Sequence, residues 1–306
     1  MVQVSHLERA FSQNEQNQKP KMNLAASWYI AITSEELSSQ SQRIQLFGRS
    51  LVAWRNKIGK PVIMDDVSTY VTKEEYGYIW VWYGSVNPLF NLPVFDVTEN
   101  NKHNYIYNYF SFTAKTSVQK IIEIVLNHHH IIRLHNSSFI DQIEHTCLDE
   151  KNVELSKLPI TKEAWFGTIT ETQIKGYFGI SEIAGFLGLK ITNLTNRVDA
   201  WPSGFLSRIK INGQHKINIF SSASPISENE IKWHVLIFVE KTNNFLLDPL
   251  YYLVVVWQKK ASLLVDKSVR NLIDKYISQP SIEIDKTVFN FRKFYETWVA
   301  KVKQNR

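Results

Sequence analysis

Four histidines gather in one short stretch of the chain. His128, His129, His130 and His135 lie within eight positions of one another, in a chain that holds nine histidines in all. Residues three or four apart on a helix share a face, so Asn127 and His130 would lie together, and His135 would join them if the helix ended near it. Two imidazoles and a carboxylate from elsewhere form the ligand set of mononuclear non-haem iron sites. The stretch therefore supplies two of three iron ligands, although histidines also suit a helix C-terminus without any metal.

The cysteine content and the charge narrow the classes of function. Cys147 is the only cysteine, so neither an intrachain disulfide nor a thiolate-bound zinc or iron–sulfur site is expected. The net charge of +6 is scattered without a continuous basic stripe, which argues against a nucleic-acid partner. The longest apolar run, residues 249–257, is far shorter than the roughly 20 residues of a membrane helix. With no apolar signal segment either, we expect a cytoplasmic protein without a membrane partner.

The first part of the chain reads as a small antiparallel β domain. Residues 1–22 are polar and form a flexible lead-in, and residues 23–95 carry β-branched and aromatic runs separated by glycines. In "KIGKP", Gly59 takes the position of a hairpin turn that needs unusual backbone angles. Prolines in "VNPLFNLPVFD" mark a boundary near residue 95.

The second part, residues 96–306, combines helices with several strands. Ser117 is a suitable N-cap for a helix whose apolar residues recur at helical spacing. Strand-like segments fill residues 165–240, with a hairpin signal at Asn212–Gly213, and helices follow from residue 244. We predict an α+β fold, in which a helix-grip domain wraps an antiparallel sheet around a long C-terminal helix. The 13 tyrosines, 17 phenylalanines and 9 tryptophans favour an aromatic-lined pocket for a small molecule.

The order of these motifs resembles a known enzyme family. Residues 27–135 contain "SWYIAITSEEL", "LFGRSLVAWRNKIGKPV", "YGYIWVWYG" and "EIVLNHHHIIRLH", in that order. The series is similar to that of the α-subunits of Rieske non-haem iron oxygenases. The resemblance implies a Rieske-like β domain followed by a helix-grip catalytic domain, and an assembly of identical subunits, a trimer or a dimer.

The chain departs from this family at the cluster ligands. The family binds its Rieske [2Fe-2S] cluster through Cys-x-His and Cys-x2-His motifs that precede the "YGYIWVWYG" strand. Here "MDDVSTYVTKEE", residues 64–75, bridges that interval without a cysteine or a histidine. We therefore expect no Rieske cluster.

The iron motif of the family is only partly present. The resemblance places the two histidine ligands at His130 and His135, and it places the family's acidic residue between cluster and iron at Asn127. The third ligand, an aspartate in the family, falls on Tyr251, with Asp248 one helical turn away. Such a set binds iron weakly, so we expect no metal and no cofactor, with His130 and His135 as vestigial ligands and Fe(II) as the alternative.

These residues predict an enzyme that moves protons on an oxygenase scaffold. Its expected acid–base residues are His128, His130, His135, Glu123 and Tyr251. Its expected substrate contacts are Asn127, Asp248 and Tyr252, and His129 is expected to point away from the pocket. A cyclisation by conjugate addition suits such a site. The chain most resembles the Rieske-like cyclases of cyanobacterial aeruginosin biosynthesis, and this resemblance implies that an amine closes onto a cyclohexenone derived from dihydrotyrosine. The alternatives are an iron enzyme supplied with external electrons and a non-catalytic small-molecule-binding protein.

Overall fold

The fold was analysed in a computed structural model that describes residues 22–94, 104–127, 140–149, 151, 153–154, 158–174, 192–241 and 286–304. Residues 22–94, called the small β region below, form two antiparallel sheets. The first sheet has the order β1-β6-β5, with β1 at Ser27–Thr33, β6 at Tyr78–Tyr83 and β5 at Thr72–Glu75. The second has the order β2-β3-β4, with β2 at Gln42–Leu46, β3 at Arg49–Arg55 and β4 at Pro61–Met64.

The small β region is held together by aromatic side chains. Every residue of β6 is buried, and Trp80 and Trp82 are part of the core. The predicted hairpin between β3 and β4 is confirmed, because Gly59 has a φ of +79° and the backbone N–H of Asn56 donates to the carbonyl of Lys60 at 2.9 Å. Phe47 lies between β2 and β3, and its ring centroid is 4.6 Å from that of Tyr83 in β6. This contact joins the two sheets.

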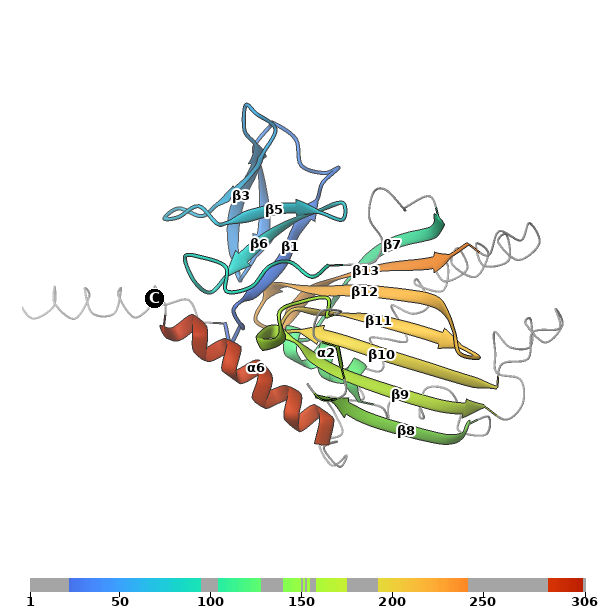
Figure 1. Cartoon of the computed structure of the whole chain (residues 1–306). Coiled ribbons are helices and arrows are strands. Elements are labelled where there is room, and N and C mark those ends of the chain that lie inside the picture. Colours follow the sequence, from blue (N-terminus) through green and yellow to red (C-terminus); the bar gives the residue numbers. More distant parts are fainter. Residues whose placement is uncertain are drawn as a thin grey trace, which may run out of the picture.

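The rest of the described chain is built on one seven-stranded antiparallel sheet, ordered β7-β13-β12-β11-β10-β9-β8 (Figure 1). Its strands are β7 Tyr105–Ala114, β8 Ile140–Leu148, β9 Phe166–Ile174, β10 Asn193–Trp201, β11 Gly204–Ile211, β12 Gln214–Ser227 and β13 Glu230–Glu240. The Asn212–Gly213 hairpin is confirmed, with both residues at positive φ, 49° and 78°.

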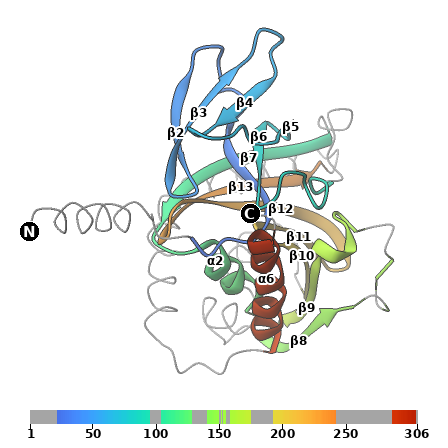
Figure 2. The same ribbon diagram turned by 90° about the vertical axis from the view of Figure 1, so that its left-hand side faces the viewer.

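Two helices lie on one face of this sheet (Figure 2). α2 spans Val118–Leu126 and begins as predicted at Ser117, whose hydroxyl accepts the backbone N–H of Lys120 at 3.3 Å. α6 spans Lys286–Gln304, and the sheet curves around it from β12 to β8. The α+β fold with a C-terminal helix is therefore confirmed. No helix within the described part of the chain is long and apolar enough to cross a membrane.

The small β region packs against both the sheet and α6. The hydroxyl of Ser224 in β12 donates to the carbonyl of Ile30 in β1 at 2.6 Å, and Trp80 meets Phe220 at 5.8 Å between ring centroids. On the side of the helix, the backbone N–H of Ala26 donates to the carbonyl of Trp298 at 3.0 Å. The small β region therefore contacts α6 as well as the seven-stranded sheet.

Candidate functional site

The structure describes only part of the predicted site. His128, His130, His135, Asp248, Tyr251 and Tyr252 lie outside the described residues. Glu123 and Asn127 are described, and both are buried at the end of α2.

Glu123 faces the interior and is paired with Arg292 of α6. Its two carboxylate oxygens accept hydrogen bonds from Arg292 Nε at 2.9 Å and Nη2 at 2.8 Å. Gln119, one turn earlier on α2, donates to Oε1 at 2.8 Å. The Glu123 side chain is 2% exposed, so the ion pair is a shielded clasp between α2 and α6. If Glu123 transfers a proton, it does so while both of its carboxylate oxygens accept hydrogen bonds from the Arg292 guanidinium.

α2 ends earlier than the histidine spacing suggested. Leu126 is the last helical residue, and Asn127 adopts an extended conformation with φ −81° and ψ 102°. The backbone N–H of Asn127 still donates to the carbonyl of Glu123 at 3.0 Å. The prediction that Asn127 and His130 share a helix face assumed that the helix continues through Asn127. Because Asn127 is extended, that spacing rule does not apply to it.

The face of the sheet under α6, called the inner face, carries a set of buried polar groups. Phe166 defines this face, since its ring meets Phe291 and Phe294 of α6 at 5.4 and 5.7 Å. Strand side chains alternate, so every second residue of β9 after Phe166 points the same way. The buried inner-face residues that carry a hydroxyl are Thr168, Thr170 and Thr172 in β9, Ser207 in β11 and Ser221 in β12.

His145 of β8 lies on this inner face, and each of its two ring nitrogens contacts a hydroxyl group. Its Nδ1 lies 2.8 Å from the hydroxyl of Thr170, and its Nε2 lies 3.0 Å from the hydroxyl of Thr287 in α6. The Cys147 thiol lies 3.3 Å from the same Thr287 hydroxyl. The sequence prediction missed His145. Its signal was the alternation of "IDQIEHTCL", which puts Ile143, His145 and Cys147 on one side of the strand.

The polar groups continue toward the middle of the sheet. Asn196 of β10 is the register partner of Thr170, and the Ser207 hydroxyl lies 2.6 Å from Asn196 Oδ1 and donates to it. Further along, the indole N–H of Trp233 donates to the Ser221 hydroxyl. The inner face thus offers hydrogen-bonding groups from its β8 edge to β13, between aromatic and aliphatic side chains.

His234 of β13 lies on the opposite face of the sheet. It packs against the ring of Tyr78 at 5.6 Å, and only 2% of the residue is exposed. Burial, helped by the charge of Lys232, lowers the pKa of His234 to about 3, so the ring is neutral at ordinary pH. This second missed histidine is a buried group of the interface with the small β region.

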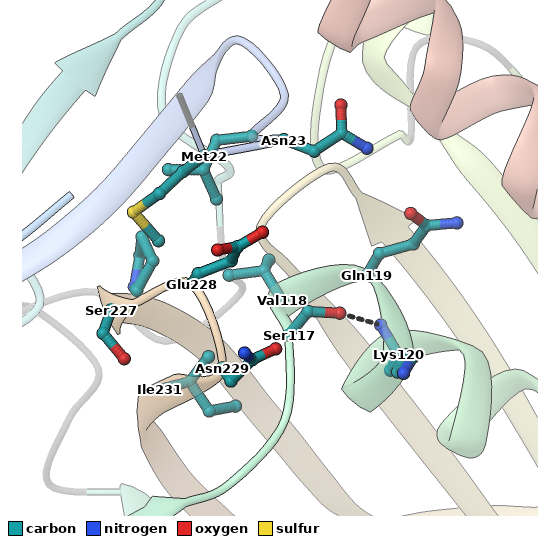
Figure 3. A pocket seen from close by; sticks show the side chains of 12 residues that line it. Met22, Asn23, Ser117, Val118, Gln119, Lys120, Ser227, Glu228, Asn229 and Ile231 are labelled. Atoms are coloured by element: carbon teal, nitrogen blue, oxygen red, sulfur yellow. Dashed lines mark hydrogen bonds between the residues drawn. The ribbon is translucent and has the colours of Figure 1, made fainter. Parts of the chain in front are cut away.

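A pocket of about 190 Å³ opens at the start of α2 (Figure 3). Met22, Ser117, Lys120 and Glu228 are among the residues that line it, and Ser117 is the helix N-cap. Asn127 follows the other end of α2, about 13 Å along the helix axis. The pocket therefore lies at the opposite end of α2 from Asn127.

The loop after β4 is closed by the carboxylate of Asp65. Oδ1 accepts the backbone N–H groups of Val67 and Ser68 at 3.0 and 2.8 Å, and Oδ2 accepts Tyr70 Oη at 2.9 Å and Arg49 Nη1 at 3.0 Å. Burial alone would raise the pKa of Asp65, but these hydrogen bonds outweigh it and lower the pKa to about 2. The loop is a self-contained turn held by one ionised side chain.

Comparisons with known proteins agree on one scaffold. The chain is 26% identical to aminopyrrolnitrin oxygenase PrnD of Pseudomonas fluorescens over 341 aligned positions, which cover 92% of this chain and 93% of that protein. Dicamba monooxygenase bound to dicamba superposes with a TM-score of 0.61 at 12% identity, over 92% of this chain and 99% of that one. The chain has the fold of a Rieske oxygenase α-subunit.

Further similarities support the same assignment. The terminal oxygenase of carbazole 1,9a-dioxygenase from Nocardioides aromaticivorans IC177 superposes with a TM-score of 0.59 at 11% identity, over 92% of this chain and 97% of that one. No family model matches the sequence. The similarity to PrnD and to these structures supports homology to the Rieske oxygenases, which the sequence motifs had indicated.

The residues of the small β region do not fit a Rieske cluster. A Rieske centre takes two cysteines and two histidines, and residues 22–94 contain neither residue type. The interval in which the resemblance places the ligand motifs, residues 64–75, contains the turn closed by Asp65. Among the described residues there is also no group of three or more His, Cys, Asp or Glu side chains that could hold a metal ion.

Proposed function

We propose that this protein is a non-redox enzyme of secondary metabolism that uses the oxygenase scaffold for an acid–base cyclisation. In the proposed reaction, the lone pair of an amine nitrogen forms a bond to the β-carbon of a cyclohexenone in the same molecule. The electrons of the carbon–carbon double bond move to the carbonyl oxygen, the ammonium loses a proton, and the α-carbon gains one. The product is an octahydroindole unit, as in the Rieske-like cyclases of aeruginosin biosynthesis that the sequence resembles.

One observation carries this proposal. The fold is that of an oxygenase α-subunit, while the small β region has no cluster ligands and its loop is closed by Asp65. Without a cluster the site has no internal electron donor, so oxygen activation would depend on a separate supply of electrons. A conjugate addition needs neither electrons nor oxygen, and the polar groups of the inner face suit it.

Each predicted residue has a proposed part in this reaction. His130 and His135 are the leading candidates for the base, with His128, Tyr251 and Glu123 as further acid–base groups. The proposed substrate contacts are Asn127, Asp248 and Tyr252. For Glu123, the ion pair with Arg292 supports a positioning part in place of direct proton transfer.

Turnover of a synthetic amino-cyclohexenone tests the proposal. Because such a compound also cyclises unaided, the readout is the rate above the enzyme-free control and the enantiomeric excess of the product. A variant carrying both His130→Ala and His135→Ala should lose about 100-fold in rate, while His129→Ala should stay close to the parent. Binding of the enone without turnover or stereochemical bias would contradict the proposal and favour a binding protein.

The second candidate is an iron enzyme that receives electrons from outside or runs a redox-neutral step. His130 and His135 retain the spacing of two iron ligands, and the relatives named above are oxygenases. Iron bound there would supply Lewis-acid or oxygen chemistry. The third ligand position, Tyr251, argues against tight iron binding, since a carboxylate is the expected ligand.

The proposal includes the organisation of the chain. We place a lead-in at residues 1–22, the reduced Rieske-like domain at 23–95 and the catalytic domain at 96–306. We also propose a cytoplasmic enzyme that assembles as a homo-oligomer, a trimer or a dimer. Sedimentation of the purified protein measures the oligomeric state directly.

A further inference from the structure

His145 is held between two hydroxyl groups. Thr170 of β9 lies 2.8 Å from Nδ1, and Thr287 of α6 lies 3.0 Å from Nε2. Thr170 and Thr287 are 5% and 3% exposed, so both hydroxyls are shielded from bulk water. The ring therefore has a buried hydroxyl oxygen at each nitrogen.

This arrangement suits every protonation state of the ring. A neutral imidazole has one N–H donor and one acceptor nitrogen, whereas a hydroxyl both donates and accepts. Either tautomer is satisfied if the two hydroxyls rotate, and the imidazolium donates to both oxygens. Protons can thus enter and leave His145 without movement of any heavy atom.

The two hydroxyls that contact His145 belong to different parts of the fold. On one side, the Thr287 hydroxyl also contacts the Cys147 thiol at 3.3 Å, and either group can be the donor. On the other side, Thr170 belongs to the buried inner-face hydroxyls and is the register partner of Asn196. These contacts therefore connect the start of α6, at Thr287, with strand β9, at Thr170.

We propose that His145, Thr170 and Thr287 form a proton relay that serves the acid–base reaction on the inner face. His145 acts through Thr170: it receives the proton that the base has removed from the attacking amine, and it supplies a proton for the α-carbon. One proton leaves nitrogen and one is gained by carbon, so no oxidant or reductant is needed. This inference rests on the proposed function only for the identity of the reaction.

The tautomer of His145 tests the relay without any substrate. The ring nitrogens are observed by ¹⁵N NMR of histidine-labelled protein, and the His145 signals are assigned by their loss in His145→Gln. We expect averaged shifts from two exchanging tautomers in the parent. Thr287→Val removes the Nε2 partner and should leave the Nδ1–H tautomer alone, whereas Thr287→Ser should restore exchange. A single fixed tautomer in the parent would overturn the relay.

Kinetics of the same variants test its use in turnover. Thr287→Val and Thr170→Val should lower kcat by about 10–100-fold with little change in KM, and the serine variants should recover most of the rate. Thr146→Val, on the exposed side of β8, is the matched control and should match the parent. Unchanged kcat in both valine variants would overturn the relay even if the tautomers exchange. If no preparation turns over an enone, the cyclisation proposal fails, whereas the NMR result still decides the relay.

Discussion

The small β region and the inner face of the seven-stranded sheet differ in what their buried groups are able to do. In the small β region, β6 is buried along its whole length. The Asp65 carboxylate there accepts backbone hydrogen bonds from the turn that it closes. On the inner face, buried hydroxyls from three strands accompany His145, whose contacts suit more than one protonation state.

Under the proposed function, this difference separates a structural part from a reactive part. A charged group with fixed partners in one ionisation state, such as Asp65, contributes stability and positions its neighbours. Where hydroxyls and an imidazole share protons, the same scaffold supports acid–base chemistry. Substitutions in the small β region should therefore change stability alone, and those on the inner face should also change turnover.

The largest effect is expected at the clasp between α2 and α6. Glu123→Gln removes a buried carboxylate that accepts two hydrogen bonds from Arg292 and should lower the free energy of unfolding by about 2–4 kcal/mol. Chemical denaturation measures this loss, and Glu123→Gln combined with Arg292→Met should recover part of it. Unchanged stability with abolished turnover would instead make Glu123 a direct acid–base residue.

A smaller effect is expected from His234, which ties the sheet to the small β region. Its pKa of about 3 lies below the ordinary value of 6.5, so the unfolded chain takes up the proton first as the pH falls. Stability contributed by the neutral ring is full above about pH 6.5 and should fall by about 2–3 kcal/mol on going to about pH 4.5. Thermal unfolding of His234→Phe should lack this part of the pH dependence, and an unaltered profile would contradict the assignment.

The variant Asp65→Asn tests whether the small β region contributes to stability without contributing to turnover. Asp65→Asn should cost about 1–2 kcal/mol at neutral pH, because the neutral amide replaces a carboxylate that accepts five hydrogen bonds. The carboxylate's contribution is present above the ordinary pKa of 3.8 and is lost as the pH falls toward about 2. Turnover should not change, and the exposed neighbour in Asp66→Asn is the control. A large fall in turnover would break the division between the two regions.

The smallest effect is expected at the start of α2. Ser117→Ala removes the acceptor of the Lys120 N–H and should cost about 1 kcal/mol. Ser117→Asp should keep the cap and serves as the comparison, with both measured by thermal unfolding. Equal stability of the alanine and aspartate variants would show that the cap contributes nothing there.

Local features of the fold could be predicted from the sequence because their causes are local. Gly59 and Asn212–Gly213 mark turns through backbone angles that few other residues adopt, and Ser117 marks a helix start through its own side chain. The family motifs then indicated the α+β arrangement that the structure confirms.

The contacts of the inner face could not be predicted because they join distant segments. Thr287 is 142 positions from His145, and Arg292 is 169 positions from Glu123. Apolar spacing also failed to show where α2 ends, since the histidine stretch continues the pattern while Asn127 is already extended. His234 sits in a strand buried on both faces, so alternation gave no sign of which side it faces.

Iron content measured together with turnover tests the central claim most directly. The protein is produced with iron supplied, its metal content is determined, and enone cyclisation is compared before and after chelation. We predict iron far below one atom per chain and a rate and product stereochemistry unchanged by the chelator. About one tightly bound iron per chain, with cyclisation lost on chelation and restored by Fe(II), would contradict the account.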